Sequence, residues 1–209
     1  MKMKLNLPNK LTVLRLFLVP IFLIIGFLPE SVIPFHISCL ICAVLFIGTA
    51  LTDMFDGKIA RRDNLITDFG KFLDPVADKF MVIGALFVIL YKFPRMYIPM
   101  MITLIVIVFR ELAVTSMRLV VSTGNGIVVA ANMLGKIKTV SQIVFICTAL
   151  LEPVVEFVVE AWIIPYGTQY FLHGVYPLTW ASMVFTLVMT LWSGINYIKA
   201  YWKYLDPEK

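Results

Sequence analysis

Six long apolar segments dominate the chain and restrict the folds that are open to it. They span residues 11–29, 36–61, 70–92, 97–122, 133–151 (or as far as 164) and 176–203. Each is close to the roughly 20 residues that a helix needs to cross a membrane, and 60% of all residues are hydrophobic. A backbone surrounded by lipid must satisfy its own hydrogen bonds, which helices do. We therefore predict an all-α integral membrane protein with six transmembrane helices.

The chain shows no internal repeat, low-complexity tract or linker. One domain over residues 1–209 is therefore the economical interpretation. The basic stretch before and at the start of the first segment carries Leu5, Leu7 and Leu11. A basic segment with apolar side chains suits the membrane surface, so we predict an N-terminal interfacial segment near the lipid head groups.

The distribution of charge predicts the orientation in the membrane. With six spans both termini lie on one side, together with most lysines and arginines. The other side holds only Lys92 and Arg95, beside Glu30, Glu152, Glu156 and Glu160. The positive-inside rule then predicts a multi-pass protein of the cytoplasmic membrane with both termini in the cytoplasm. The net charge of +5 follows from this topology, and no basic loop or groove indicates nucleic-acid binding.

Four aspartates lie within 26 residues, at the polar ends of the second and third segments. They are Asp53, Asp56, Asp74 and Asp78. At 3.6 residues per turn, the first two share one helix face and the last two share another. The connector 62–69 is short and polar, so the two helices are antiparallel neighbours whose acidic faces can converge. Acids beside a membrane require compensation, and hard divalent metals take oxygen ligands. The cluster therefore predicts a metal site for phosphate chemistry at the cytoplasmic end.

Small residues accompany the aspartates on the same helix faces. Gly57 and Ala60 lie on the first face and Gly70 lies on the second, which leaves room for a bulky ligand against the backbone. Arg61 is suited to donate two hydrogen bonds to a phosphate. The alternative is a set of plain salt bridges with Arg61, Arg62, Lys71 and Lys79. Ion pairing alone, however, requires neither two converging acidic faces nor small residues between them.

These positions form the pattern D-x-x-D-G-x-x-A-R, eight residues, G-x-x-x-D-x-x-x-D, which begins at Asp53 and ends at Asp78. The pattern resembles the signature of the CDP-alcohol phosphotransferases, and six membrane helices fit the same family over the whole chain. The resemblance implies two divalent cations, Mg²⁺ or Mn²⁺, held by the four aspartates and bound to the pyrophosphate of a CDP-linked lipid. It also implies that Asp78 is the base for the acceptor hydroxyl, and that the protein is a homodimer.

The resemblance further implies a set of residues around the CDP-lipid. One stretch, from Asn9 to Thr12, resembles the family segment that closes over the nucleotide. The full set is Asn9, Thr12, Gly57, Ala60, Arg61, Thr67 and Gly70. The implied reaction is attack of a hydroxyl on the phosphorus attached to diacylglycerol, with CMP as the leaving group.

Cations in the fourth and fifth segments predict an anionic acceptor. Arg110 and Glu111 lie inside the fourth segment, where charges need a reason. Several cations directed into one cavity favour a phosphate, and the candidates are Arg110, Arg118, Lys136 and Lys138. The two lysines are about 200° apart on an ideal helix, so at most one faces the cavity squarely. The alternative is that Arg110 pairs with Glu111 or another buried acid, and that the lysines only follow the positive-inside rule.

Three shorter patterns resemble the phosphatidylglycerophosphate synthase branch of the family. They are N-x-P-N-x-L-T-x-x-R at 6–15, R-E-L at 110–112 and G-K-x-K-T at 135–139. This resemblance implies transfer from CDP-diacylglycerol to sn-glycerol 3-phosphate. Serine, inositol phosphate or another lipid stay open as acceptors. A divalent-cation transporter would also use intramembrane acids, but near the bilayer midplane, and the position of the aspartates at one end favours an enzyme.

Overall fold

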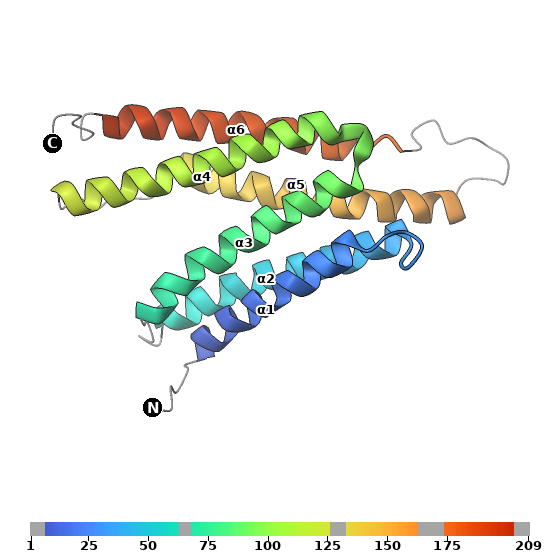
Figure 1. The fold of residues 1–209 in the computed structure, drawn as a ribbon, viewed down its shortest axis with the longest axis horizontal. Helices are drawn as coiled ribbons and strands as arrows, with labels where there is room; N and C mark the ends of the chain where they lie inside the picture. The colour runs from blue at the N-terminus through green and yellow to red at the C-terminus, as the bar shows by residue number, and fades with distance from the viewer. Residues whose placement is uncertain (1–6, 63–67, 126–132, 163–173, 203–209) are drawn as a thin grey trace. The chain divides into compact units, whose positions relative to one another are not determined.

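The computed structural model describes residues 7–62, 68–125, 133–162 and 174–202 (Figure 1). Within these ranges, side chains are described for 9–53, 70, 73–121, 133–162 and 174–202. The helices are α1 (Leu7–Phe27), α2 (Phe35–Arg62), α3 (Asp68–Lys92), α4 (Tyr97–Asn125), α5 (Met133–Trp162) and α6 (Pro177–Tyr201), with a 3₁₀ turn η1 (Pro94–Met96) before α4. No strand occurs in the described ranges, so the predicted all-α fold is confirmed.

Five stretches are long and apolar enough to cross a membrane, which makes the chain a multi-pass membrane protein. They are Asn9–Phe27, Phe35–Asp53, Pro94–Val121, Met133–Trp162 and Pro177–Tyr201. Helix α3 is not among them, because it carries Asp74, Asp78, Lys79 and Lys92 within its length. A sixth span through α3 therefore stays a prediction.

The helix bounds follow the predicted apolar segments closely. The longer of the two predictions for the fifth segment is right, since α5 continues through Pro153 to Trp162. At the other end of the chain, α1 begins at Leu7. Residues 1–6 lie outside the described part, and Leu7 and Leu11 already belong to α1. The interfacial segment therefore stays a prediction.

The helices form two compact units, which we describe one at a time. The first comprises Met1–Pro94 and Ile146–Tyr176, and the second comprises Arg95–Phe145 and Pro177–Lys209. Helix α5 contributes its last part to the first unit and its first part to the second. The single domain over 1–209 stays a prediction.

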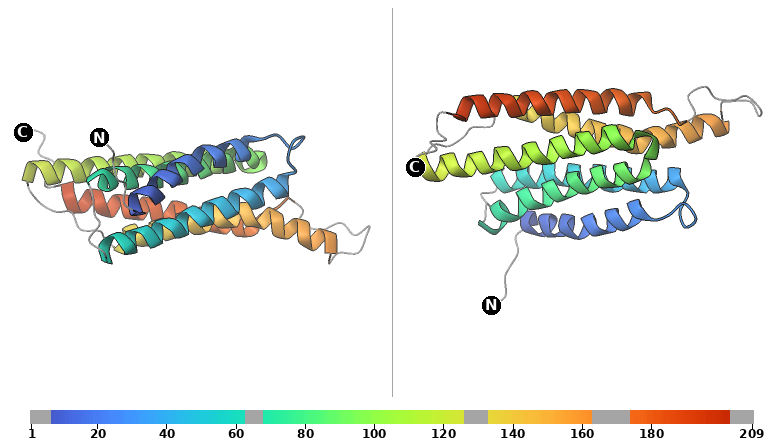
Figure 2. Two further views of the ribbon diagram at one scale, coloured as in Figure 1. Left: turned by 90° about the horizontal axis from the view of Figure 1, so that it is seen from below. Right: turned by 45° about the horizontal axis from the view of Figure 1, so that its top comes forward.

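In the first unit, α1 packs along both α2 and α3 (Figure 2). Val19 and Phe22 of α1 are buried together with Phe46 of α2. Gly26 marks a close approach of α1 to α3, because an added Cβ there would overlap the side chain of Val88. Helix α1 is therefore the helix that both α2 and α3 contact in this unit.

In the second unit, α4 packs against α6, and hydroxyl groups contribute to the packing. Thr186, Thr190 and Ser193 of α6 are fully or almost fully buried. Thr186 Oγ1 donates a hydrogen bond of 2.9 Å to the carbonyl oxygen of Ser141 on α5. Small hydroxyl residues commonly join helices in membranes, because they allow close approach and supply hydrogen bonds.

Candidate active site

The first turns of α1 bury a polar stripe. Asn9, Thr12 and Arg15 are spaced three residues apart and therefore lie on one side of the helix. All three are buried, and the side continues with the apolar Val19 and Phe22. Helix α1 thus presents hydrogen-bonding groups to its neighbours at the end where the aspartates of α2 and α3 lie.

Arg15 joins the carboxylates of two different helices. Its Nη1 lies 2.9 Å from Oδ1 of Asp53 on α2 and 2.7 Å from Oδ1 of Asp78 on α3. Thr12 Oγ1 donates a hydrogen bond of 2.5 Å to Oδ1 of Asp74. Three of the four predicted aspartates are therefore brought together against one side of α1.

The cation of this cluster is buried, whereas the acids are partly open. The Arg15 side chain is 2% exposed, while those of Asp53 and Asp78 are 43% and 45% exposed. A buried guanidinium needs carboxylate partners to offset its loss of water. An ionised carboxylate accepts about four hydrogen bonds or metal contacts. Asp53 and Asp78, whose side chains are partly exposed, therefore keep capacity for a ligand beyond Arg15.

Carboxylate oxygens are the donors that hard divalent cations prefer, so the donor set suits Mg²⁺ or Mn²⁺. Among the described side chains, no three acidic, histidine or cysteine groups stand together as a metal-binding set. The fourth acid, Asp56, lies on α2 but outside the described side chains. The site for two divalent cations accordingly stays a prediction. The structure contributes one finding: Asp53 and Asp78 are close enough for one nitrogen atom to contact both.

The residues predicted to bind the CDP-lipid are only partly described. Asn9, Thr12 and Gly70 are buried in the first unit. Gly57, Ala60 and Arg61 belong to the last turns of α2, but their surroundings are outside the described part, as is all of Thr67. Thr12 contacts an aspartate directly, which places the predicted nucleotide-closing stretch beside the acidic cluster.

From the sequence alone, Arg15 had no predicted role of its own. It was only the last position of the pattern at 6–15 and one positive charge among many. A signal was nonetheless present: an arginine within a membrane segment needs a partner, and Arg15 follows Asn9 and Thr12 at helical spacing. The alternative of salt bridges with Arg61, Arg62, Lys71 and Lys79 stays a prediction, whereas Arg15 of α1 pairs with two of the aspartates.

A second polar cluster lies in the unit of α4, α5 and α6. Glu111 Oε1 accepts hydrogen bonds from Lys138 Nζ and, at 3.0 Å, from Arg110 Nη1. Arg110 Nη2 also donates to Ser193 Oγ at 2.7 Å. Glu111 therefore orients two of the predicted acceptor-binding cations and offsets one of their charges.

Tyr197 of α6 is buried and contacts two arginines of α4. Arg118 donates to its hydroxyl from Nη2 at 2.7 Å and from Nε at 3.2 Å. The guanidinium carbons of Arg110 and Arg118 lie 5.9 and 5.3 Å from the ring centroid, within cation–π range. Gly194 and Gly135 lie beside Arg110, because a Cβ added at these glycines would lie 3.4 or 3.8 Å from its side chain, in ordinary van der Waals contact. Neither Tyr197 nor Ser193 was predicted from the sequence.

The structure thus brings together Arg110, Arg118 and Lys138, but not Lys136. Lys138 is buried and Lys136 is exposed, as expected from their opposite directions on a helix. The pairing of Arg110 with Glu111, which the sequence left as an alternative, is present. Acceptor binding by these cations stays a prediction.

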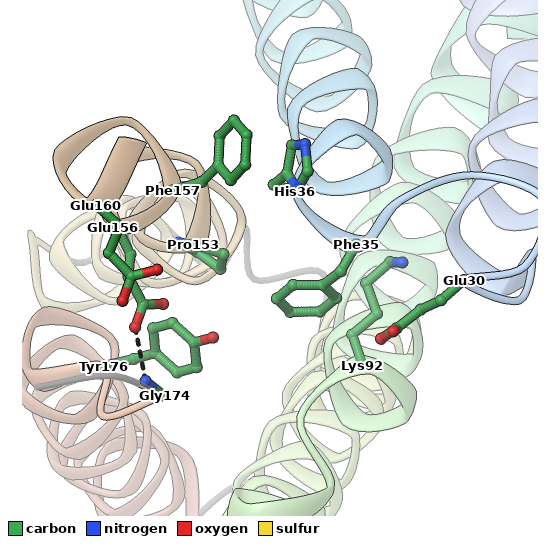
Figure 3. A pocket seen from close by; sticks show the side chains of 10 residues that line it. All are labelled: Glu30, Phe35, His36, Lys92, Pro153, Glu156, Phe157, Glu160, Gly174 and Tyr176. Atoms are coloured by element: carbon green, nitrogen blue, oxygen red, sulfur yellow. Dashed lines mark hydrogen bonds between the residues drawn. The ribbon is translucent and has the colours of Figure 1, made fainter. Parts of the chain in front are cut away.

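A cavity of about 310 Å³ lies at the far end of the first unit (Figure 3). His36 stacks on Phe157 at 3.7 Å between ring centroids, and Glu156 accepts a hydrogen bond of 2.6 Å from the Gly174 amide. Along α2, His36 precedes Asp53 by about 26 Å. None of the predicted site residues lines this cavity.

Known proteins resemble the chain over almost its whole length. The family model described as CDP-alcohol phosphatidyltransferase matches residues 5–192. A protein of Bacillus subtilis named CDP-diacylglycerol–glycerol-3-phosphate 3-phosphatidyltransferase is 42% identical over 210 residues, covering 96% of this chain and 97% of the relative. A protein of the same name from Yersinia enterocolitica is 32% identical over 207 residues, covering 98% of this chain and 100% of the relative. The chain therefore belongs to the CDP-alcohol phosphatidyltransferase family.

Proposed function

We propose that the protein transfers the phosphatidyl group of CDP-diacylglycerol to sn-glycerol 3-phosphate, giving phosphatidylglycerophosphate and CMP. The names of the relatives, which match over nearly the full length of both chains, support this donor and this acceptor. In the structure, the proposal rests on the convergence of Asp53, Asp74 and Asp78 on the polar stripe of α1. The reaction belongs to phospholipid biosynthesis.

The proposed chemistry uses the open carboxylates of the first unit. The acceptor hydroxyl attacks the phosphorus attached to diacylglycerol, a new P–O bond forms, and the bond to the CMP oxygen breaks. Asp78 takes the hydroxyl proton; its side chain is 45% exposed and is held in place by Arg15. Divalent cations held by the four aspartates would polarise the phosphoryl oxygens and neutralise the charge of the leaving CMP.

The second unit supplies positive charge for the phosphate of the acceptor. Arg110, Arg118 and Lys138 carry three positive charges, and Glu111 offsets one of them. The remainder is similar to the charge of a phosphate monoester, which is about −1.5 to −2 at neutral pH. This balance favours glycerol 3-phosphate over serine, whose zwitterion carries no net charge.

We also propose that α3 is a sixth span of the cytoplasmic membrane and that both termini lie in the cytoplasm. We further propose that the protein is a homodimer. Apart from Lys92 at its end, the charged residues of α3 all precede Phe80, and the stretch from Phe80 to Tyr91 is apolar. Phe80, Phe87 and Tyr91 are exposed, as side chains facing lipid or a second subunit would be. The bias of lysine and arginine supports the orientation.

The decisive experiment offers several acceptors to the purified protein. CMP release from CDP-diacylglycerol in Mg²⁺ is measured with glycerol 3-phosphate, serine, inositol phosphate or no acceptor, and Asp53→Asn serves as the inactive control. We expect CMP release with glycerol 3-phosphate and with none of the other acceptors. Release with serine or inositol phosphate at a higher rate would reassign the acceptor, and cation flux into vesicles without acceptor-dependent CMP release would favour the transporter.

A further inference from the structure

Arg15 contacts the same carboxylates that the proposed metal site uses. One nitrogen atom, Nη1, lies within hydrogen-bonding distance of Asp53 on α2 and of Asp78 on α3. The arginine side chain is 2% exposed, and a guanidinium does not lose its proton in proteins. A permanent positive charge from α1 is therefore built into the junction of α2 and α3.

A permanent charge at this position has two opposing effects. Without bound metal it offsets the repulsion between the carboxylates, and so holds α2 and α3 together at their acidic ends. When a divalent cation binds to the same carboxylates, the guanidinium repels it and competes for their oxygen atoms. Burial strengthens both effects, because charges out of water are screened less.

We propose that Arg15 is the internal counter-cation of the carboxylate site. It positions Asp53 and Asp78 in the metal-free protein, and it lowers the affinity of the site for divalent cations. The proposal rests on the proposed function for the kind of ligand, a divalent cation. Beyond that function, it assigns a positioning role to a residue of α1 that belongs to neither acidic helix.

The test measures Mn²⁺ binding to the full chain in lipid nanodiscs, without substrate, by electron paramagnetic resonance titration. Arg15→Met removes the charge and keeps an apolar stem, and Arg15→Lys keeps the charge. Lys10→Gln is the matched control, because Lys10 is an exposed cation on the same helix. We expect Arg15→Met to bind Mn²⁺ at least about tenfold more tightly than the wild type, and the other two variants to change by less than about threefold.

Thermal unfolding supplies a second readout. In EDTA, Arg15→Met should unfold at a lower temperature than the wild type, and Mn²⁺ should raise its midpoint more than that of the wild type. A variant that folds only with Mn²⁺ present would also support the proposal. A purely structural role predicts instead an equal loss with and without metal.

Two outcomes overturn the proposal and are distinguishable. If Arg15→Met binds Mn²⁺ no more tightly than the wild type, or stays unfolded at every Mn²⁺ concentration, the counter-cation role is wrong while the metal site stands. If the wild type and Asp53→Asn bind Mn²⁺ alike, the metal site of the proposed function is wrong, and the proposal for Arg15 is overturned with it.

Discussion

Replacing Tyr197 by phenylalanine removes the hydroxyl oxygen from a side chain that both Arg110 and Arg118 contact. The ring contacts with both arginines remain, whereas the two hydrogen bonds from Arg118 are lost. Hydrogen bonds to a charged group contribute about 1.5–3 kcal/mol, but Arg118 is exposed and water replaces part of this. We therefore expect a loss of about 1 kcal/mol, or roughly a fivefold rise in the KM for glycerol 3-phosphate.

The assay is steady-state CMP release, with each substrate varied while the other is saturating. The KM for CDP-diacylglycerol should stay within about twofold of the wild type, because Tyr197 lies in the unit without the aspartates. Tyr201→Phe is the matched control, since this tyrosine lies one turn further on α6 and contacts the Tyr197 ring at 5.4 Å. An unchanged glycerol 3-phosphate KM in Tyr197→Phe, or an equal rise for both substrates, would refute the reasoning that Tyr197 orients an acceptor-binding arginine.

The remaining predictions concern the carboxylate cluster. Asp53→Asn and Asp74→Asn should nearly abolish CMP release without preventing membrane insertion, and a well-inserted variant with normal activity in Mg²⁺ would contradict the metal role. Asp78→Asn should slow the chemical step more than it weakens CDP-lipid binding, as single-turnover rates and binding titrations can show; identical behaviour of Asp56→Asn would leave no distinct base. Thr12→Val keeps the side-chain volume but loses the hydrogen bond to Asp74, and should lower the free energy of unfolding by about 1 kcal/mol in denaturant titrations.

Local patterns predicted the helices well. Apolar runs give helix positions because a backbone in lipid must form its own hydrogen bonds, and helical spacing placed Asp74 and Asp78 on one side of α3. Contacts between residues far apart in the sequence were not predictable in this way. Arg15 reaches Asp78 across 63 positions, and Arg118 reaches Tyr197 across 79. Nothing in the spacing of one helix reveals which residue of another helix it will meet.

Buried tyrosine and serine residues illustrate a further reason for the missed contacts. In a membrane segment, a tyrosine such as Tyr197 resembles the aromatic residues found at membrane interfaces. A serine such as Ser193 resembles the small residues that allow helices to pack. Both residue types have common structural roles, so their contacts with Arg110 and Arg118 became evident only once α4 and α6 were seen side by side.

The division of the chain into two units has an evolutionary consequence. The carboxylates and Arg15 belong to α1, α2 and α3, whereas Arg110, Arg118, Ser193 and Tyr197 belong to α4 and α6. The contacts described for each group lie within its own unit, so mutations in the second group remove none of the described contacts of the first. If the two groups have the roles proposed above, a lineage can acquire a new alcohol acceptor by drift and selection on α4 and α6, while the residues that handle the activated lipid are inherited unchanged.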